Sequence, residues 1–186
     1  TRGEYWCIKH NRTCKPIEEA LKYIQRYSLD TMDRIREFKR IRTDATMTVI
    51  QGDARTVKLP SRRKVDGIFT SPPYVGMIDY HEQHAYAYDL LGFKRKDDLE
   101  IGPLYKGQGL EARRSYTQGI ADVLSNCKQY LKDDFDIFLV ANDKYNLYPE
   151  IAEKSGMKIV NQFKRPVLNR TERDRNPYSE IIFHFK

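Results

Sequence analysis

Two consecutive prolines, Pro72 and Pro73, follow a short β-prone run at Val65–Thr70 and constrain the fold more than any other feature of the sequence. Proline fixes its own φ angle and has no amide hydrogen, so a central strand cannot continue through this pair. The residue before a proline, here Ser71, is restricted to extended conformations. The chain must therefore leave a strand at this point and enter a rigid loop that ends on Tyr74.

Short β-prone runs alternate with helical patterns along the chain. Apolar spacing predicts helices over 16–27, 31–41, 78–91, 111–131 and 147–155. Runs typical of strands cover 46–50, 65–70, 135–141, 157–163 and 179–185, and the glycine-rich stretch 92–110 is expected to be a loop. This alternation predicts an α/β fold with a mostly parallel sheet. No helical pattern separates the last two strands, so we expect them to pair antiparallel.

Composition and charge narrow the class of protein. The chain has 186 residues, one domain's worth, and no apolar run long enough to span a membrane. It shows no secretory leader, and its 3 cysteines, an odd number, do not make a disulfide framework, so we expect a cytoplasmic protein. The formal net charge of +7 fits a nucleic-acid partner, although many ordinary proteins share such a charge.

The segment from Ser71 to Tyr74 carries the clearest chemical signal. In open α/β sheets, ligands bind beyond the carboxyl ends of the strands. A proline-rigid segment presents carbonyl acceptors with few local donors competing for them, Ser71 adds a hydroxyl, and Tyr74 adds a flat ring. Together these groups suit a planar amine, such as a nucleobase flipped out of its helix.

Ser71-Pro72-Pro73-Tyr74 resembles the catalytic motif of the S-adenosylmethionine-dependent amino-methyltransferases, whose pattern is Asp/Asn/Ser-Pro-Pro-Tyr/Phe/Trp. The resemblance implies a Rossmann-like methyltransferase fold and direct in-line methyl transfer to an exocyclic base amine. Ser71 and the Pro72 carbonyl would hold the amine, and Tyr74 would stack on the base. The Ser form is most associated with the 4-amino group of cytosine in DNA, and the Asp and Asn forms with adenine in DNA or with bases in RNA. We therefore expect a site-specific DNA methyltransferase of the restriction-modification kind, with cytosine-N4 favoured over adenine-N6.

A second element, Gly52-Asp53-Ala54, follows the predicted strand at 46–50. The resemblance implies that Asp53 accepts a hydrogen bond from the amino group of the cofactor's adenine and that the Ala54 amide meets the ring. Thr70, the last residue before the catalytic motif, is assigned to the cofactor site on the same grounds.

The family's Phe-x-Gly-x-Gly loop has no counterpart directly after a strand, because Gly107-Gln108-Gly109 lies inside a long loop. The resemblance therefore covers a partial catalytic domain at 45–186 that lacks the first two strands, after an N-terminal helical segment at 1–44. We expect an N-terminal segment or a second subunit to supply the glycine loop. The alternatives are an inactive nucleic-acid-binding partner domain and a tRNA or rRNA base-amine methyltransferase with RNA as its partner.

Other reactive residues are given subordinate roles. Cytosine-C5 methylation needs a thiolate nucleophile, and none of the cysteines lies in a Pro-Cys loop after a strand. We expect no metal site, since neither the histidine pair nor the cluster of Cys7, His10 and Cys14 has a full ligand set. The candidates for contact with nucleic acid are His81, His84, Arg170, Arg173 and Arg175.

Overall fold

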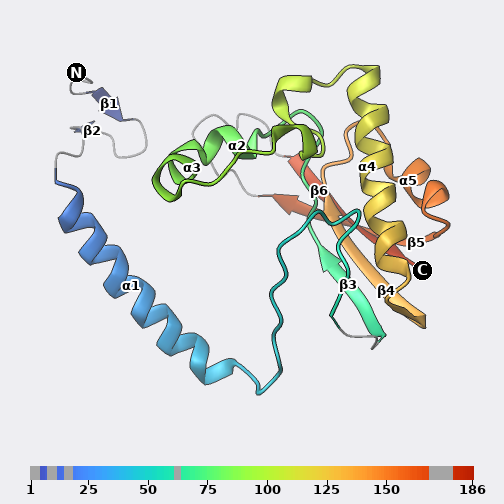
Figure 1. The fold of residues 1–186 in the computed structure, drawn as a ribbon, viewed down its shortest axis with the longest axis horizontal. Coiled ribbons are helices and arrows are strands. Elements are labelled where there is room, and N and C mark those ends of the chain that lie inside the picture. Colours follow the sequence, from blue (N-terminus) through green and yellow to red (C-terminus); the bar gives the residue numbers. More distant parts are fainter. Residues whose placement is uncertain (1–4, 8–11, 15–18, 61–63, 168–177) are drawn as a thin grey trace. The chain divides into compact units, whose positions relative to one another are not determined.

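The computed structural model describes residues 5–7, 12–14, 19–60, 64–167 and 178–186. The described residues fall into two compact units, one ending at Val49 and the other beginning at Ile50. Each unit is described by itself below, with the element labels of Figure 1.

The first unit contains a short hairpin and one long helix. Strands β1 (Tyr5–Cys7) and β2 (Arg12–Cys14) pair antiparallel, and helix α1 (Ala20–Ile41) follows them. The sequence predicts two helices here, over 16–27 and 31–41, and this division is wrong because α1 is continuous.

The continuity of α1 has a local cause. Residues 28–30 contain neither glycine nor proline. The Thr31 hydroxyl donates to the Tyr27 carbonyl over 2.7 Å, and Arg34 forms a 2.8 Å ion pair with Asp30 one turn away. Pairs at this spacing stabilise a helix, so no break forms at the predicted junction.

The second unit is built on a four-stranded sheet in the order β3-β4-β6-β5. The strands are β3 (Val65–Thr70), β4 (Leu131–Ala141), β5 (Ile159–Val167) and β6 (Tyr178–Phe185). Strands β3 and β4 are parallel, and β6 is antiparallel to both β4 and β5. Three strands therefore point one way and the C-terminal strand runs against them, which confirms the predicted α/β class and is consistent with part of a Rossmann-like methyltransferase sheet.

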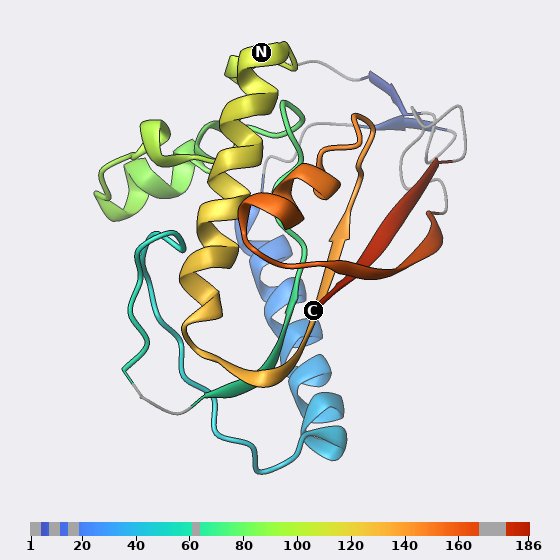
Figure 2. The same ribbon diagram turned by 90° about the vertical axis from the view of Figure 1, so that its right-hand side faces the viewer.

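Helices α4 (Leu110–Lys128) and α5 (Tyr148–Lys154) cover one face of this sheet, as Figure 2 shows. The Tyr148 ring stacks on Phe183 of β6 with 4.6 Å between ring centroids. Apolar side chains of both helices and of strands β4 and β6 form the core on this side, among them Ile120, Leu124, Ile137, Leu139, Ile151 and Phe185.

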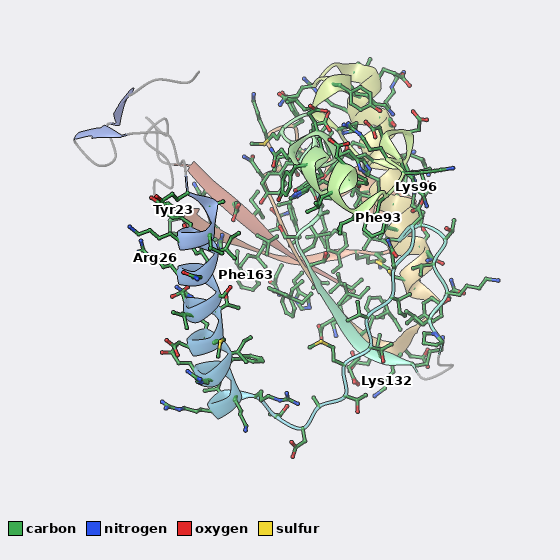
Figure 3. The ribbon with its side chains drawn as sticks, turned by 60° about the vertical axis from the view of Figure 1, so that its left-hand side comes forward. Tyr23, Arg26, Phe93, Lys96, Lys132 and Phe163 are labelled. Carbon is green, nitrogen blue, oxygen red and sulfur yellow. The ribbon has the colours of Figure 1, made fainter. Side chains whose placement is uncertain are left out.

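Within the second unit, no described helix packs on the opposite face of the sheet. Phe69 of β3 lies beside Phe138 of β4, and it is 80% exposed. Phe163 of β5, labelled in Figure 3, is 50% exposed. Exposed aromatic rings on a sheet face indicate a surface suited to burial against further protein.

The predicted strand at 46–50 is absent, and this prediction is wrong. Met47 and Val49 are 83% and 88% exposed, and residues 46–50 pair with no strand that the structure describes. Backbone amides and carbonyls need a neighbouring strand to form a ladder. β propensity without such a neighbour leaves the segment as extended coil.

The region between β3 and α4 contains shorter helices than the sequence predicts. The helix expected over 78–91 is divided at His84 into α2 (Tyr80–Gln83) and α3 (Ala85–Leu91). The expected loop that follows contains two 3-10 turns, η1 (Asp97–Leu99) and η2 (Leu104–Lys106).

Candidate active site

The Ser71–Tyr74 segment lies at the carboxyl end of β3, the position that its sequence predicts. Ser71 is exposed, and Pro72, Pro73 and Tyr74 are half-buried. Strand β4 runs parallel to β3, so the residues after Ala141 lie at the same edge of the sheet. The motif therefore sits at the edge where α/β sheets bind their ligands.

A tight turn follows the motif. Gly76 has a φ of 61°, and its amide donates to the Gly102 carbonyl over 2.9 Å. A Cβ atom at this position would lie 2.3 Å from the Gly107 carbonyl oxygen. Only glycine fits both the left-handed backbone and this close approach.

The Gly107-Gln108-Gly109 segment packs against that turn. The Gln108 side-chain amide donates to the Gly76 carbonyl over 3.2 Å, and its oxygen accepts from the Tyr145 hydroxyl. Arg113 donates to the Gln108 carbonyl over 2.8 Å. These contacts make the segment a brace for the loop after the motif.

Helix α4 holds the backbone of the motif itself. The Tyr116 hydroxyl donates to the Pro73 carbonyl over 2.9 Å and lies 2.9 Å from the Tyr148 hydroxyl. Burial raises the pKa of Tyr116 to about 12 and that of Tyr148 well above the ordinary value, so both phenols stay protonated at neutral pH. This bond uses the Pro73 carbonyl and leaves the Pro72 carbonyl for another donor.

The Tyr74 ring is held at its far end. Its hydroxyl donates to Glu180 Oε1 over 2.7 Å, and Arg165 Nη2 lies 2.6 Å from Glu180 Oε2. Glu180 belongs to β6, one residue before Ile181, which pairs with Ala141 at the end of β4. Tyr74 thus reaches from the end of β3 to the beginning of β6.

A cavity of about 470 Å³ opens at the end of the sheet where β4 stops and β6 begins. Burial raises the pKa of Asp143, which also accepts a 2.7 Å hydrogen bond from the Leu147 amide at the start of α5. Mostly polar side chains and two apolar ones line it: Asn142, Asp143, Lys144, Gln162, Phe163, Lys164, Ser179 and Ile181.

Asp53 lies in a different cavity, of about 620 Å³, lined with residues of α4. Arg55 binds both of its carboxylate oxygens, with a shortest distance of 2.6 Å, and these hydrogen bonds lower the pKa of Asp53. The Arg55 backbone amide also donates to Asp53 Oδ1 over 2.9 Å, and Arg55 Nε contacts both oxygens. A carboxylate offers about four lone-pair positions, so a further donor to Asp53 would compete with Arg55. The Ala54 carbonyl accepts a hydrogen bond from the Asn126 side chain over 3.0 Å. Neither Asp53 nor Ala54 lines the cavity at the end of β4.

The two histidines lie on the α2–α3 region. His81 Nδ1 is 2.5 Å from the Tyr88 hydroxyl, and the exposed His84 stands between the two helices. No group of three or more potential metal ligands was found among the residues with described side chains. Within the described helices, none is long and apolar enough to cross a membrane. Thr70 ends β3 beside the motif, and the three arginines Arg170, Arg173 and Arg175 lie outside the described residues.

Three residues that hold the Ser71–Tyr74 segment were not predicted from the sequence: Tyr116, Arg165 and Glu180. Tyr116 falls on the apolar stripe of α4 and reads as ordinary core. Glu180 is a single acidic residue at the start of an apolar strand, which was a usable signal because carboxylates are seldom fully buried without a partner. Its partner could not be read from the sequence, since Tyr74 is 106 residues away.

Comparison with known proteins relates the chain to the class of enzyme that the motif suggests: it is similar to a type II methyltransferase over 98% of its length. That relative is Type II methyltransferase M.MjaII of Methanocaldococcus jannaschii, and the two are 53% identical over 195 aligned residues. The chain spans only 37% of the relative's own length. No protein-family model matches the chain.

Proposed function

We propose that this chain is the catalytic part of a site-specific DNA methyltransferase that methylates an exocyclic base amine. The observation that carries the proposal is the rigid Ser71–Tyr74 segment at the carboxyl end of β3, held by Tyr116 from α4. The similarity to a type II methyltransferase over nearly the whole chain supports the same reaction class. The Ser form of the motif favours the 4-amino group of cytosine as the target.

The Ser71 hydroxyl and the Pro72 carbonyl accept the two N–H groups of the target amine. Hydrogen bonds to these acceptors draw the amine out of conjugation with the ring and expose the nitrogen lone pair. The exposed Ser71 is accessible to such a substrate, and the Pro73 carbonyl is already engaged by Tyr116. Tyr74 stacks on the base, an interaction worth about 1–3 kcal/mol for a base on an aromatic ring.

S-adenosylmethionine would supply an electrophilic methyl group for in-line attack by that lone pair. The adenine end of this cofactor would be held at Asp53, which lines a cavity of about 620 Å³; an adenine amino group there would take over a carboxylate oxygen that Arg55 engages. The Gly107-Gln108-Gly109 segment is not assigned to the methionine end, because Gln108 at its centre is bonded to Gly76 in the loop after the motif and to Arg113 of α4.

We therefore propose that another polypeptide segment, in the same chain or in a second subunit, completes the cofactor site. Two features support this: β3 is an edge strand, and Phe69 on it is 80% exposed. The relative's greater length is also consistent with catalytic segments beyond the aligned region.

The proposal is tested by incubating the complete enzyme with methyl-labelled S-adenosylmethionine and with DNA or RNA, followed by nucleoside analysis. The expected product is N4-methylcytosine in DNA. Ser71→Ala and Tyr74→Ala should each abolish most of the transfer, whereas Ser115→Ala, an exposed position on α4, should not.

The outcomes separate the alternatives. N6-methyladenine would change the target base but keep the reaction, and label found only in RNA would overturn the DNA assignment. Transfer that survives the double change of Ser71 and Tyr74 to alanine would refute the catalytic role of the motif.

A further inference from the structure

Glu180 is a charged side chain in an almost fully buried position. Its side chain is 5% exposed, whereas the side chain of its ion-pair partner Arg165 is 45% exposed. A carboxylate buried in this way is costly unless hydrogen bonds and an opposite charge compensate it. Both forms of compensation are present, because Tyr74 donates to one oxygen and Arg165 to the other.

The hydrogen bond from Tyr74 to Glu180 restrains the Tyr74 ring. Rotation about the Cα–Cβ bond swings the hydroxyl, so fixing the backbone and the hydroxyl fixes that angle and the axis of the ring. Turning of the ring about this axis is then restrained by the hydrogen bond, because a phenol O–H prefers to lie in the plane of its ring. Tyr116 fixes the backbone of the motif at the Pro73 carbonyl, and Glu180 fixes the hydroxyl 2.7 Å away. The position and axis of the ring are therefore set before any substrate arrives, which lowers the ordering cost at binding.

We propose that Glu180 is a positioning residue that sets the Tyr74 ring against the target base, with Arg165 balancing its charge. The proposal rests on the base-stacking role given to Tyr74 in the proposed function. Glu180 does not touch the substrate, and its effect on the reaction passes through the Tyr74 hydroxyl.

A double-mutant cycle in the complete enzyme tests this coupling. Tyr74→Phe keeps the stacking ring and removes the hydroxyl, while Glu180→Ala removes the acceptor. Each single change should lower kcat about tenfold, with KM for DNA nearly unchanged. The double variant should be no slower than the slower single variant, because both changes remove the same interaction.

A conservative variant and a structural control accompany the cycle. Glu180→Gln keeps an acceptor oxygen for Tyr74 and should restore kcat to within about threefold of the wild type. If Glu180→Ala leaves Arg165 stranded and the protein unfolds, the charge-free pair Arg165→Leu with Glu180→Leu replaces it and should show the same tenfold loss.

A fluorescence measurement reports how well ordered the Tyr74 ring is, independently of methyl transfer. With 2-aminopurine in place of the target base, stacking on an ordered Tyr74 should quench the fluorescence in the wild type. Glu180→Ala and Tyr74→Phe should both lengthen the fluorescence lifetime, since the ring is then free to move.

The results distinguish the positioning role of Glu180 from the base-stacking role of Tyr74 on which it rests. If Tyr74→Ala leaves transfer intact, the stacking role fails and the positioning role fails with it. If Tyr74→Ala abolishes transfer but Glu180→Ala and Tyr74→Phe leave kcat and the lifetime unchanged, only the positioning role is refuted. Strictly additive losses in the cycle would also refute it.

Discussion

The Tyr116 hydroxyl donates a 2.9 Å hydrogen bond to the Pro73 carbonyl, joining helix α4 to the backbone of the Ser71–Tyr74 segment. The two residues are 43 positions apart in the sequence, and the bond lies beside the buried contact between Tyr116 and Tyr148. A helix in the core thus determines where the loop at the edge of the sheet sits.

Tyr116→Phe should weaken both the fold and the reaction. The change removes the donor from the Pro73 carbonyl, and the loss of a buried hydrogen bond costs about 1–3 kcal/mol. Urea unfolding of the chain measures that loss, and single-turnover methylation by the complete enzyme should slow as the motif loosens. Tyr86→Phe, on a ring 69% exposed, serves as the control and should change the free energy of unfolding by less than about 0.5 kcal/mol. Equal effects of the two changes would contradict the anchoring role.

Alkaline pH should destabilise the folded chain because Tyr116 is buried in its protonated form. Burial raises the pKa of Tyr116 to about 12, whereas a tyrosine in the unfolded chain titrates near pH 10. The stabilisation from Tyr116 is therefore complete below about pH 10 and is lost as the pH rises towards 12, because the unfolded state releases its proton first.

Urea titrations between about pH 9 and pH 11 measure this effect. The free energy of unfolding of the wild type should fall by about 1 kcal/mol per pH unit more than that of Tyr116→Phe in the upper half of this range. If the free energy of unfolding fell equally with pH in the two proteins, burial would not raise the pKa of Tyr116.

Gly76→Ala should cost far more stability than Gly92→Ala. Both glycines have a positive φ, 61° and 66°, so each substitution brings the backbone strain of about 1–2 kcal/mol. Only at Gly76 would the new Cβ meet another atom, 2.3 Å from the Gly107 carbonyl oxygen, while Gly92 has open space. The difference between the two free energies of unfolding isolates the close approach, and a difference near zero would contradict it.

Asp53→Ala should weaken cofactor binding by the complete enzyme about tenfold, the amount expected from one hydrogen bond to a charged group. Asp122 lines the same cavity and offers a matched control, since Asp122→Ala removes a carboxylate that bonds Gln118. Calorimetry with S-adenosylmethionine measures both affinities. If Asp53→Ala lowers only stability, and Arg55→Ala lowers it equally, Asp53 serves the ion pair and not the cofactor.

Local rules of the sequence predicted where the Ser71–Tyr74 segment begins. The restriction that proline imposes on its own φ angle holds in any context, so the end of β3 before Ser71 could be placed from the sequence alone. The antiparallel pairing of β5 and β6 followed in the same way from the lack of a connecting helix.

Features that depend on distant partners were not accessible. The run at 46–50 has strand-forming residues, yet a strand exists only where a neighbour pairs with it. The bond between Tyr74 and Glu180 joins residues 106 positions apart, and no pattern within β6 indicates which side chain meets its carboxylate. The roles given to Asp53, Ala54 and Thr70 remain predictions.

The position of β3 at the edge of the sheet has a practical consequence for anyone who produces this chain. An uncovered edge strand with an exposed aromatic ring is a template for aggregation, and Phe69 is 80% exposed on such a strand. Expressed by itself at high concentration, the chain should self-associate through β3. Phe69→Lys should reduce that tendency, and co-expression with the polypeptide proposed to complete the cofactor site should remove it.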